Sequence, residues 1–171
     1  MLKIKTFINF IGLCFISFSP SIYAVSEKGN EDFPMSHMTW SATLLEVKGA
    51  DSADATAIGK VLRLNATEYC KRDPGGETGG TKAGITKCIE SLLAQEKGKL
   101  YSISANCIKK TITTSHLGSF TFTGRFENSE GFPVYPWKNE NTGEMLDGGM
   151  ASGGATVDAQ FATVCPSFKT W

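Results

Sequence analysis

The chain has 171 residues, 41% of them hydrophobic, and its 17 basic side chains balance its 17 acidic ones. This neutral charge gives no support for nucleic-acid binding, which favours a strong basic excess.

The N-terminus predicts an export signal. Lys3 and Lys5 precede an apolar run at residues 7–18, which has about the length of a signal-peptide core. A membrane span needs about 20 apolar residues, so a retained anchor is the weaker alternative. Ala24 is in position for cleavage. The sequence therefore predicts a periplasmic or secreted protein of the bacterial type.

Removal of residues 1–24 leaves 147 residues with a net charge of −2, enough for one domain. Residues 25–37 are polar and unpatterned and predict a flexible N-terminal arm. Residues 38–171 predict a single disulfide-stabilised domain. No later segment is long and apolar enough to suggest a transmembrane helix.

The domain is expected to begin with a strand over residues 38–47, because Trp40, Ala42 and Leu44 alternate onto one face. Small residues then predict a linker or a helix start at residues 49–57.

Residues 58–64 fit a strand or a helix. Asn65 comes three residues before Glu68, which is the pattern of a helix N-cap with a reaching glutamate. We expect Pro74 to end that short helix.

The stretch "YCKRDPGGETGGTKAGITKC", residues 69–88, has the glycine spacing of a phosphate-binding loop. Thr81 and Lys82 stand in the reverse of the order that the motif requires, and no apolar strand precedes it. The stretch therefore predicts a turn between two helices, with no nucleotide cofactor. Thr81 would cap a second helix over residues 82–97, and Gly98 would end it.

The middle of the chain predicts antiparallel strands. Apolar residues alternate over residues 99–107, and a second strand is expected over residues 110–115. In the next strand Phe120, Phe122 and Phe126 are expected to share one face.

Residues 140–143 predict a hairpin turn. Apolar residues at helical spacing from Val157 to Phe168 predict a final helix, with Thr156 as its cap. The fold class is thus α+β: a small antiparallel sheet of about four to five strands, with two or three helices packed on it.

Four cysteines follow the signal: Cys70, Cys88, Cys107 and Cys165. An even number in an exported chain predicts two disulfides. We favour Cys70–Cys88 and Cys107–Cys165, because each joins two positions that face the core; the other two pairings stay open. The spacings lack the close CxxC pairs of a zinc site, so no metal is expected.

The sequence contains no catalytic motif, so no catalytic residue is assigned. His116 could act as a general base, but no neighbour in the sequence orients it. Glu46, Asp73, Glu127 and Asp147 could form a carboxylate pair only if the fold brought two of them together.

One segment suggests recognition. Residues 130–139 concentrate Phe132, Tyr135 and Trp137, and a sugar or a peptide could stack on these rings. The alternative is that the rings complete the core, as large apolar side chains usually do.

These observations predict an exported, non-catalytic binding protein with no cofactor, whose partner is a protein or an envelope polymer. An inhibitor of an envelope-degrading enzyme is one version. The alternatives are a small extracytoplasmic hydrolase with a spatially assembled carboxylate or histidine site, and a structural component of an envelope assembly. His116 beside an acid would favour the hydrolase, whereas an exposed Tyr135–Trp137 patch would favour binding.

Overall fold

The structure is a computed structural model that describes residues 32–35, 40–72, 76–127, 131, 133–134, 136–146 and 153–168. Within these residues, antiparallel strands form one open sheet with three accompanying helices, which confirms the predicted α+β class. The predicted signal peptide lies outside the described residues, as do Phe132 and Tyr135.

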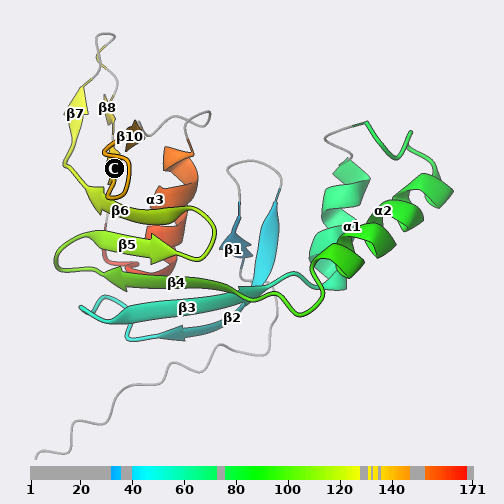
Figure 1. The fold of residues 1–171 in the computed structure, drawn as a ribbon, viewed down its shortest axis with the longest axis horizontal. Helices are drawn as coiled ribbons and strands as arrows, with labels where there is room; N and C mark the ends of the chain where they lie inside the picture. The colour runs from blue at the N-terminus through cyan, green and yellow to red at the C-terminus, as the bar shows by residue number, and fades with distance from the viewer. Residues whose placement is uncertain are drawn as a thin grey trace, which may run out of the picture.

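The eight-stranded sheet follows chain order, and successive strands lie side by side (Figure 1). Its strands are β1 (Asp32–Pro34), β2 (Ser41–Lys48), β3 (Ala55–Lys60), β4 (Tyr101–Asn106), β5 (Thr111–Thr114), β6 (Gly118–Phe122), β9 (Trp137–Asn139) and β10 (Met145–Leu146). The helices are α1 (Arg63–Arg72), α2 (Lys82–Gln95) and α3 (Gly154–Val164). A separate two-stranded sheet consists of β7 (Phe126–Glu127) and β8 (Pro133–Val134).

The sheet has more strands than the four to five predicted, and β1 and β3 account for part of the difference. β1 lies within the predicted flexible arm, but Phe33 is fully buried and pairs with Ala42 of β2. The first half of β3 lies where a linker or a helix start was expected, and its second half lies in residues 58–64, which fit a strand or a helix. Its Ala55 and Ala57 are buried in the sheet. Small residues suit β3 because β2 and β4 pair with it on either side and α3 packs against it.

One face of the sheet is covered by α3 (Figure 1). Val157, Phe161 and Val164 on this helix are fully buried, and the Phe161 ring lies 5.1 Å from that of Trp137 between centroids. The helix begins after Gly153, so the expectation that Thr156 caps it is wrong: Thr156 lies within the helix.

The predicted strand through Phe120, Phe122 and Phe126 is shorter than expected. β6 ends at Phe122, and Gly124 then adopts a φ of 110°, which turns the chain away from the sheet. Phe126 belongs to β7 and does not continue the face of Phe120 and Phe122.

The helices α1 and α2 form a hairpin between β3 and β4. Asn65 does not cap α1 but lies in its first turn, where its Oδ1 accepts a 2.9 Å hydrogen bond from the Leu62 backbone N–H. The Leu62 carbonyl accepts the Ala66 N–H, so Leu62 takes the cap position and Asn65 supplies the reciprocal bond of a capping box. For α2 the prediction is confirmed: Thr81 Oγ1 accepts the Gly84 N–H at 3.0 Å.

Both favoured disulfides are present. Cys70–Cys88 joins α1 to α2, and Cys107–Cys165 joins the end of β4 to the end of α3. Both bonds are those that the sequence pattern favours, so the predicted pairing is confirmed.

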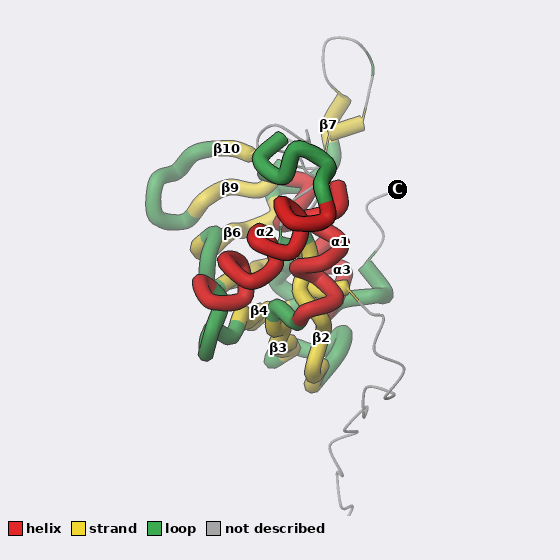
Figure 2. Tube along the Cα trace, turned by 90° about the vertical axis from the view of Figure 1, so that its right-hand side faces the viewer, coloured by secondary structure: helices red, strands yellow, loops and turns green. Residues whose placement is uncertain are grey.

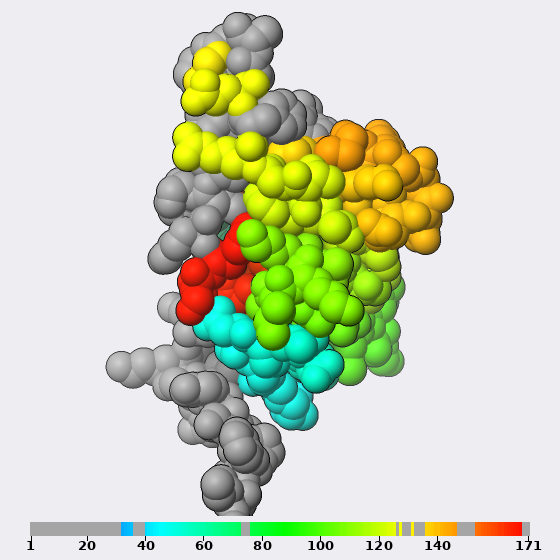
Figure 3. Space-filling view, turned by 90° about the vertical axis from the view of Figure 1, so that its left-hand side faces the viewer, coloured from blue at the N-terminus to red at the C-terminus, as the bar shows by residue number. Residues whose placement is uncertain are grey.

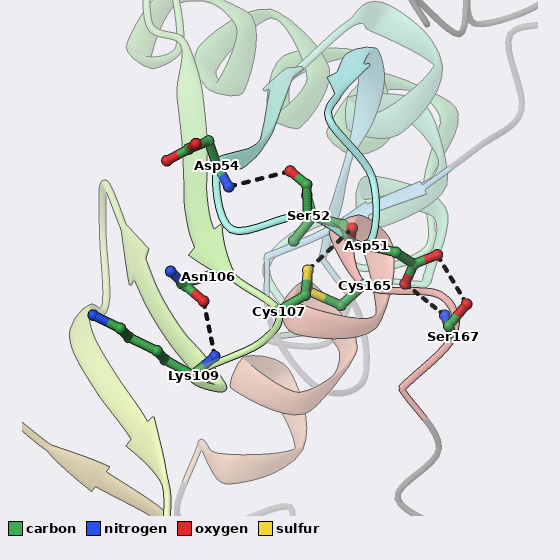
Figure 4. The surroundings of a disulfide bond; sticks show 9 residues. Asp51, Ser52, Asp54, Asn106, Cys107, Lys109, Cys165 and Ser167 are labelled. Carbon is green, nitrogen blue, oxygen red and sulfur yellow. Dashed lines mark hydrogen bonds between the residues drawn. A yellow bond between two sulfur atoms is a disulfide. The ribbon is translucent and has the colours of Figure 1, made fainter. Parts of the chain in front are cut away.

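The second disulfide stands at the end of the sheet that lies away from the hairpin. There the turn after β2, the turn after β4 and the C-terminal segment meet (Figure 3). Asp51 accepts the Ser167 N–H at 2.8 Å and the Ser167 hydroxyl at 2.9 Å (Figure 4). These contacts and the disulfide hold α3 on the sheet. Among the described residues, no helix is long and apolar enough to cross a membrane.

Candidate binding surface

The helical hairpin stands beside the sheet and away from α3 (Figures 1 and 2). α1 contacts α2 and β2. None of the 14 residues of α2 is buried, and its apolar stripe of Ile85, Ile89, Leu92 and Leu93 is only half-buried. The hairpin therefore contributes little to the main core and leaves apolar surface accessible.

Four contacts hold the hairpin in place. The Cys70–Cys88 disulfide closes it, and an exposed ion pair joins Arg63 to Glu90 at 2.8 Å. The hydrogen bond to Glu90 is the main reason that the pKa of Arg63 is raised and that of Glu90 lowered.

Two further contacts attach α1 to the sheet. The Tyr69 ring packs edge-on against Trp40 at 4.9 Å, and the Thr43 hydroxyl donates to Asn65 Oδ1 at 2.9 Å. The hairpin is thus a braced projection, which presents its outer surface in a defined orientation.

Three exposed leucines lie at the base of the hairpin, and we call them the leucine patch. Leu62, Leu64 and Leu100 are 39%, 50% and 58% exposed. The first two stand at the start of α1 and Leu100 stands just before β4. Because β3 and β4 are neighbours, both connections to the hairpin leave the sheet at the same end. The leucines therefore lie on two neighbouring chain segments, and exposed apolar side chains that adjoin one another are typical of a binding surface.

Charged residues precede the leucines in the sequence. Lys60 is half-buried before Leu62, and Lys97 and Lys99 are exposed before Leu100. Lys99 pairs with Glu96 at 3.0 Å, as Arg63 does with Glu90. The residues next to the leucines in the chain therefore carry both signs of charge, as the polar rims of protein interfaces commonly do.

His116, the candidate general base, lies in a polar cluster with Gln160 and Tyr101. Its Nε2 is 3.3 Å from Nε2 of the buried Gln160, and its ring stands edge-on to Tyr101 at 5.6 Å. Burial lowers the pKa of His116, while a hydrogen bond to the Met35 backbone opposes this effect.

Glu96 lies at the edge of this cluster, where its Oε2 accepts a hydrogen bond from the Tyr101 hydroxyl. Burial, followed by this hydrogen bond, raises the pKa of Tyr101 to about 12. Sequence reasoning missed this cluster because its members lie far apart in the chain.

Of the carboxylate candidates, Glu46 and Glu127 lie in different sheets. Glu46 is ion-paired with Lys48 at 2.7 Å in β2, and Glu127 lies in the separate two-stranded sheet. Asp73 and Asp147 lie outside the described residues. In the described part of the chain, no three His, Cys, Asp or Glu side chains are grouped to hold a metal ion.

Trp137 corrects the expectation of an exposed aromatic patch at this position. Its side chain is fully buried between Phe122 and Phe161, because β9 places it under α3. Trp137 therefore has the core role that was the alternative interpretation.

Comparison of the chain with protein-family models, with curated proteins and with solved structures found no match.

Proposed function

We propose that this protein is an exported, non-catalytic binding protein, periplasmic or secreted, that contacts a protein partner through the leucine patch. The observation that carries the proposal is the braced hairpin with Leu62, Leu64 and Leu100 exposed at its base. An apolar centre with a polar rim is the usual anatomy of a protein–protein contact. The two disulfides support export, since such bonds persist in oxidising compartments.

The charge pattern favours a protein over a lipid surface as the partner. Recognition of anionic lipid takes a cluster of about four to eight Lys and Arg. Here Arg63 and Lys99 each have a carboxylate partner within 3.0 Å, which leaves Lys60 and Lys97 as the nearby cations.

The test compares binding by the wild type, Leu64→Ser and Leu45→Ser. Leu45 is a matched control because it is 43% exposed but lies on β2, outside the patch. A partner is first isolated from the exported fraction, identified and purified, and its affinity is then measured for each variant. We expect Leu64→Ser to weaken binding by at least tenfold and Leu45→Ser to leave it unchanged.

Combining Leu64→Ser with Leu100→Ser should weaken binding further, since hot-spot residues dominate such contacts. Circular dichroism and thermal unfolding verify that each variant is folded. Equal affinity of all variants for the purified partner would refute the proposed surface. If the protein bound anionic vesicles and no protein, the partner would be a lipid surface, and the proposal of a protein partner would be refuted.

A further inference from the structure

A cavity of about 160 Å³ lies where the β5–β6 turn, β9, β10 and the start of α3 meet, at the end of the strands from which the hairpin connections also leave. It is bounded by Leu117, Phe120, Asn139, Leu146, Gly153 and Val157, which come from the β5–β6 turn, β6, β9, β10 and the start of α3. The leucine patch and the His116 cluster include none of these residues, although Leu117 follows His116 in the chain and Val157 lies three residues before Gln160 on α3.

The walls of the cavity are apolar except at Asn139. Strand register places Asn139 opposite Phe120, on the face of the sheet that α3 covers. Alternation along β9 would suit an apolar residue at this position, as at Trp137 two residues before. The amide therefore stands as a polar group in an otherwise apolar wall.

The two ends of that amide have different roles. Asn139 Oδ1 accepts the backbone N–H groups of Asn141 and Thr142 at 2.9 and 3.2 Å, which holds the turn between β9 and β10. The Nδ2 group has no hydrogen-bond partner among the described residues. The turn thus fixes the side chain and leaves an N–H donor available to a ligand.

We propose that this cavity binds a small neutral molecule, with one aromatic ring or branched aliphatic group and one hydrogen-bond acceptor directed at Asn139 Nδ2. The cavity is partly open to solvent, and its volume of about 160 Å³ is similar to that of an enclosed protein cavity that holds benzene. Glu140 and Glu144 flank Asn139 on the same turn, so an anion would be repelled. The proposal is independent of the partner that the leucine patch contacts.

The experiment uses acetophenone, which has a ring and a carbonyl acceptor, and toluene, which lacks the acceptor. Each probe is titrated into the isotope-labelled exported protein, and amide and methyl NMR shifts are followed. We expect both probes to shift Leu117, Leu146 and Val157, with acetophenone binding more tightly.

Asn139→Asp is the decisive variant, because its carboxylate keeps the acceptor that holds the turn but removes the N–H donor. It should weaken acetophenone binding about threefold to tenfold, the usual effect of losing one neutral hydrogen bond, and change toluene binding little. Asn106→Asp is the matched control, since Asn106 Oδ1 likewise accepts a turn N–H, from Lys109 at 2.8 Å. It should leave both affinities unchanged.

A third variant, Leu117→Phe, fills the cavity from a half-buried position and should abolish binding of both probes. Circular dichroism and thermal unfolding check that each variant is folded. The proposal is overturned if saturating probe shifts no cavity residue, or if folded Asn139→Asp binds acetophenone as tightly as the wild type.

Discussion

The ring of Phe33 in β1 lies directly on Gly59 of β3, in the space that a side chain at position 59 would fill. A Cβ atom placed on Gly59 would be 2.5 Å from Cγ of Phe33. β1 and β3 do not pair with each other, but the Phe33 ring packs directly on Gly59 and holds the two strands together. This contact explains how a strand of three residues holds its place at the edge of the sheet.

We expect Gly59→Ala to lower the free energy of unfolding by about 1–3 kcal/mol, because the added methyl group overpacks the Phe33 contact. Urea denaturation measures the change. The double variant Gly59→Ala/Phe33→Leu should recover part of the loss relative to the sum of the single changes. Strict additivity of the two changes would show that the ring and the glycine are not coupled.

The two disulfides are expected to have different effects on the fold. Their sequence separations of 18 and 58 residues correspond to about 3 and 4 kcal/mol of stabilisation through the unfolded chain. Cys70→Ala/Cys88→Ala should mainly raise hydrogen exchange in α1 and α2, since this bond lies within the hairpin. Cys107→Ala/Cys165→Ala should raise exchange across the sheet, because that bond holds α3 on it.

Hydrogen exchange resolved by mass spectrometry separates these outcomes. If each variant instead raised exchange equally in the hairpin and in the sheet, the two parts would unfold as one unit, and the expectation would be wrong.

His116 should make stability depend on pH. His116 is exposed overall, but the partial burial of its ring lowers its pKa in the folded state, so the unfolded chain binds a proton first as the pH falls. The associated stability is complete above the ordinary histidine pKa of about 6.5 and is lost as the pH falls through the lowered value. Protonation would also place a second N–H against the Gln160 amide N–H.

Urea denaturation between pH 7.5 and 5 tests this expectation. The slope of stability against pH should be smaller in His116→Gln than in the wild type. His37→Gln is the control for the other histidine of the chain. An unchanged slope in His116→Gln would contradict the assignment.

Trp137 should act on stability rather than on recognition. Trp137→Ala removes a fully buried ring and is expected to cost about 3–5 kcal/mol of unfolding free energy. Leu64→Ser, at a half-exposed position, should cost within about 0.5 kcal/mol. Thermal unfolding of the two variants measures the contrast, and a mild effect of Trp137→Ala would argue against its burial in the core.

Much of the fold could be predicted from local patterns. The strand that contains Ile103 and Ala105 and the helix that Thr81 caps depend on alternation and capping within a few residues. The pairing of cysteines also followed from such patterns, since each cysteine continues a core-facing series. Short strands could not be predicted, because the burial of Phe33 depends on β3, which lies more than twenty residues away in the chain.

Sequence patterns alone indicated most of the longer strands and helices and favoured the cysteine pairing that the structure contains, because these depend on neighbours in the chain. The export signal stays a prediction. Only the tertiary structure decided which apolar side chains are covered: Trp137 is buried under α3, whereas Leu64 and Leu100 stay exposed. It also decided that the half-buried Asn139 lines the cavity. The physical reason is that exposure depends on which elements pack together, and residues distant in sequence determine that packing.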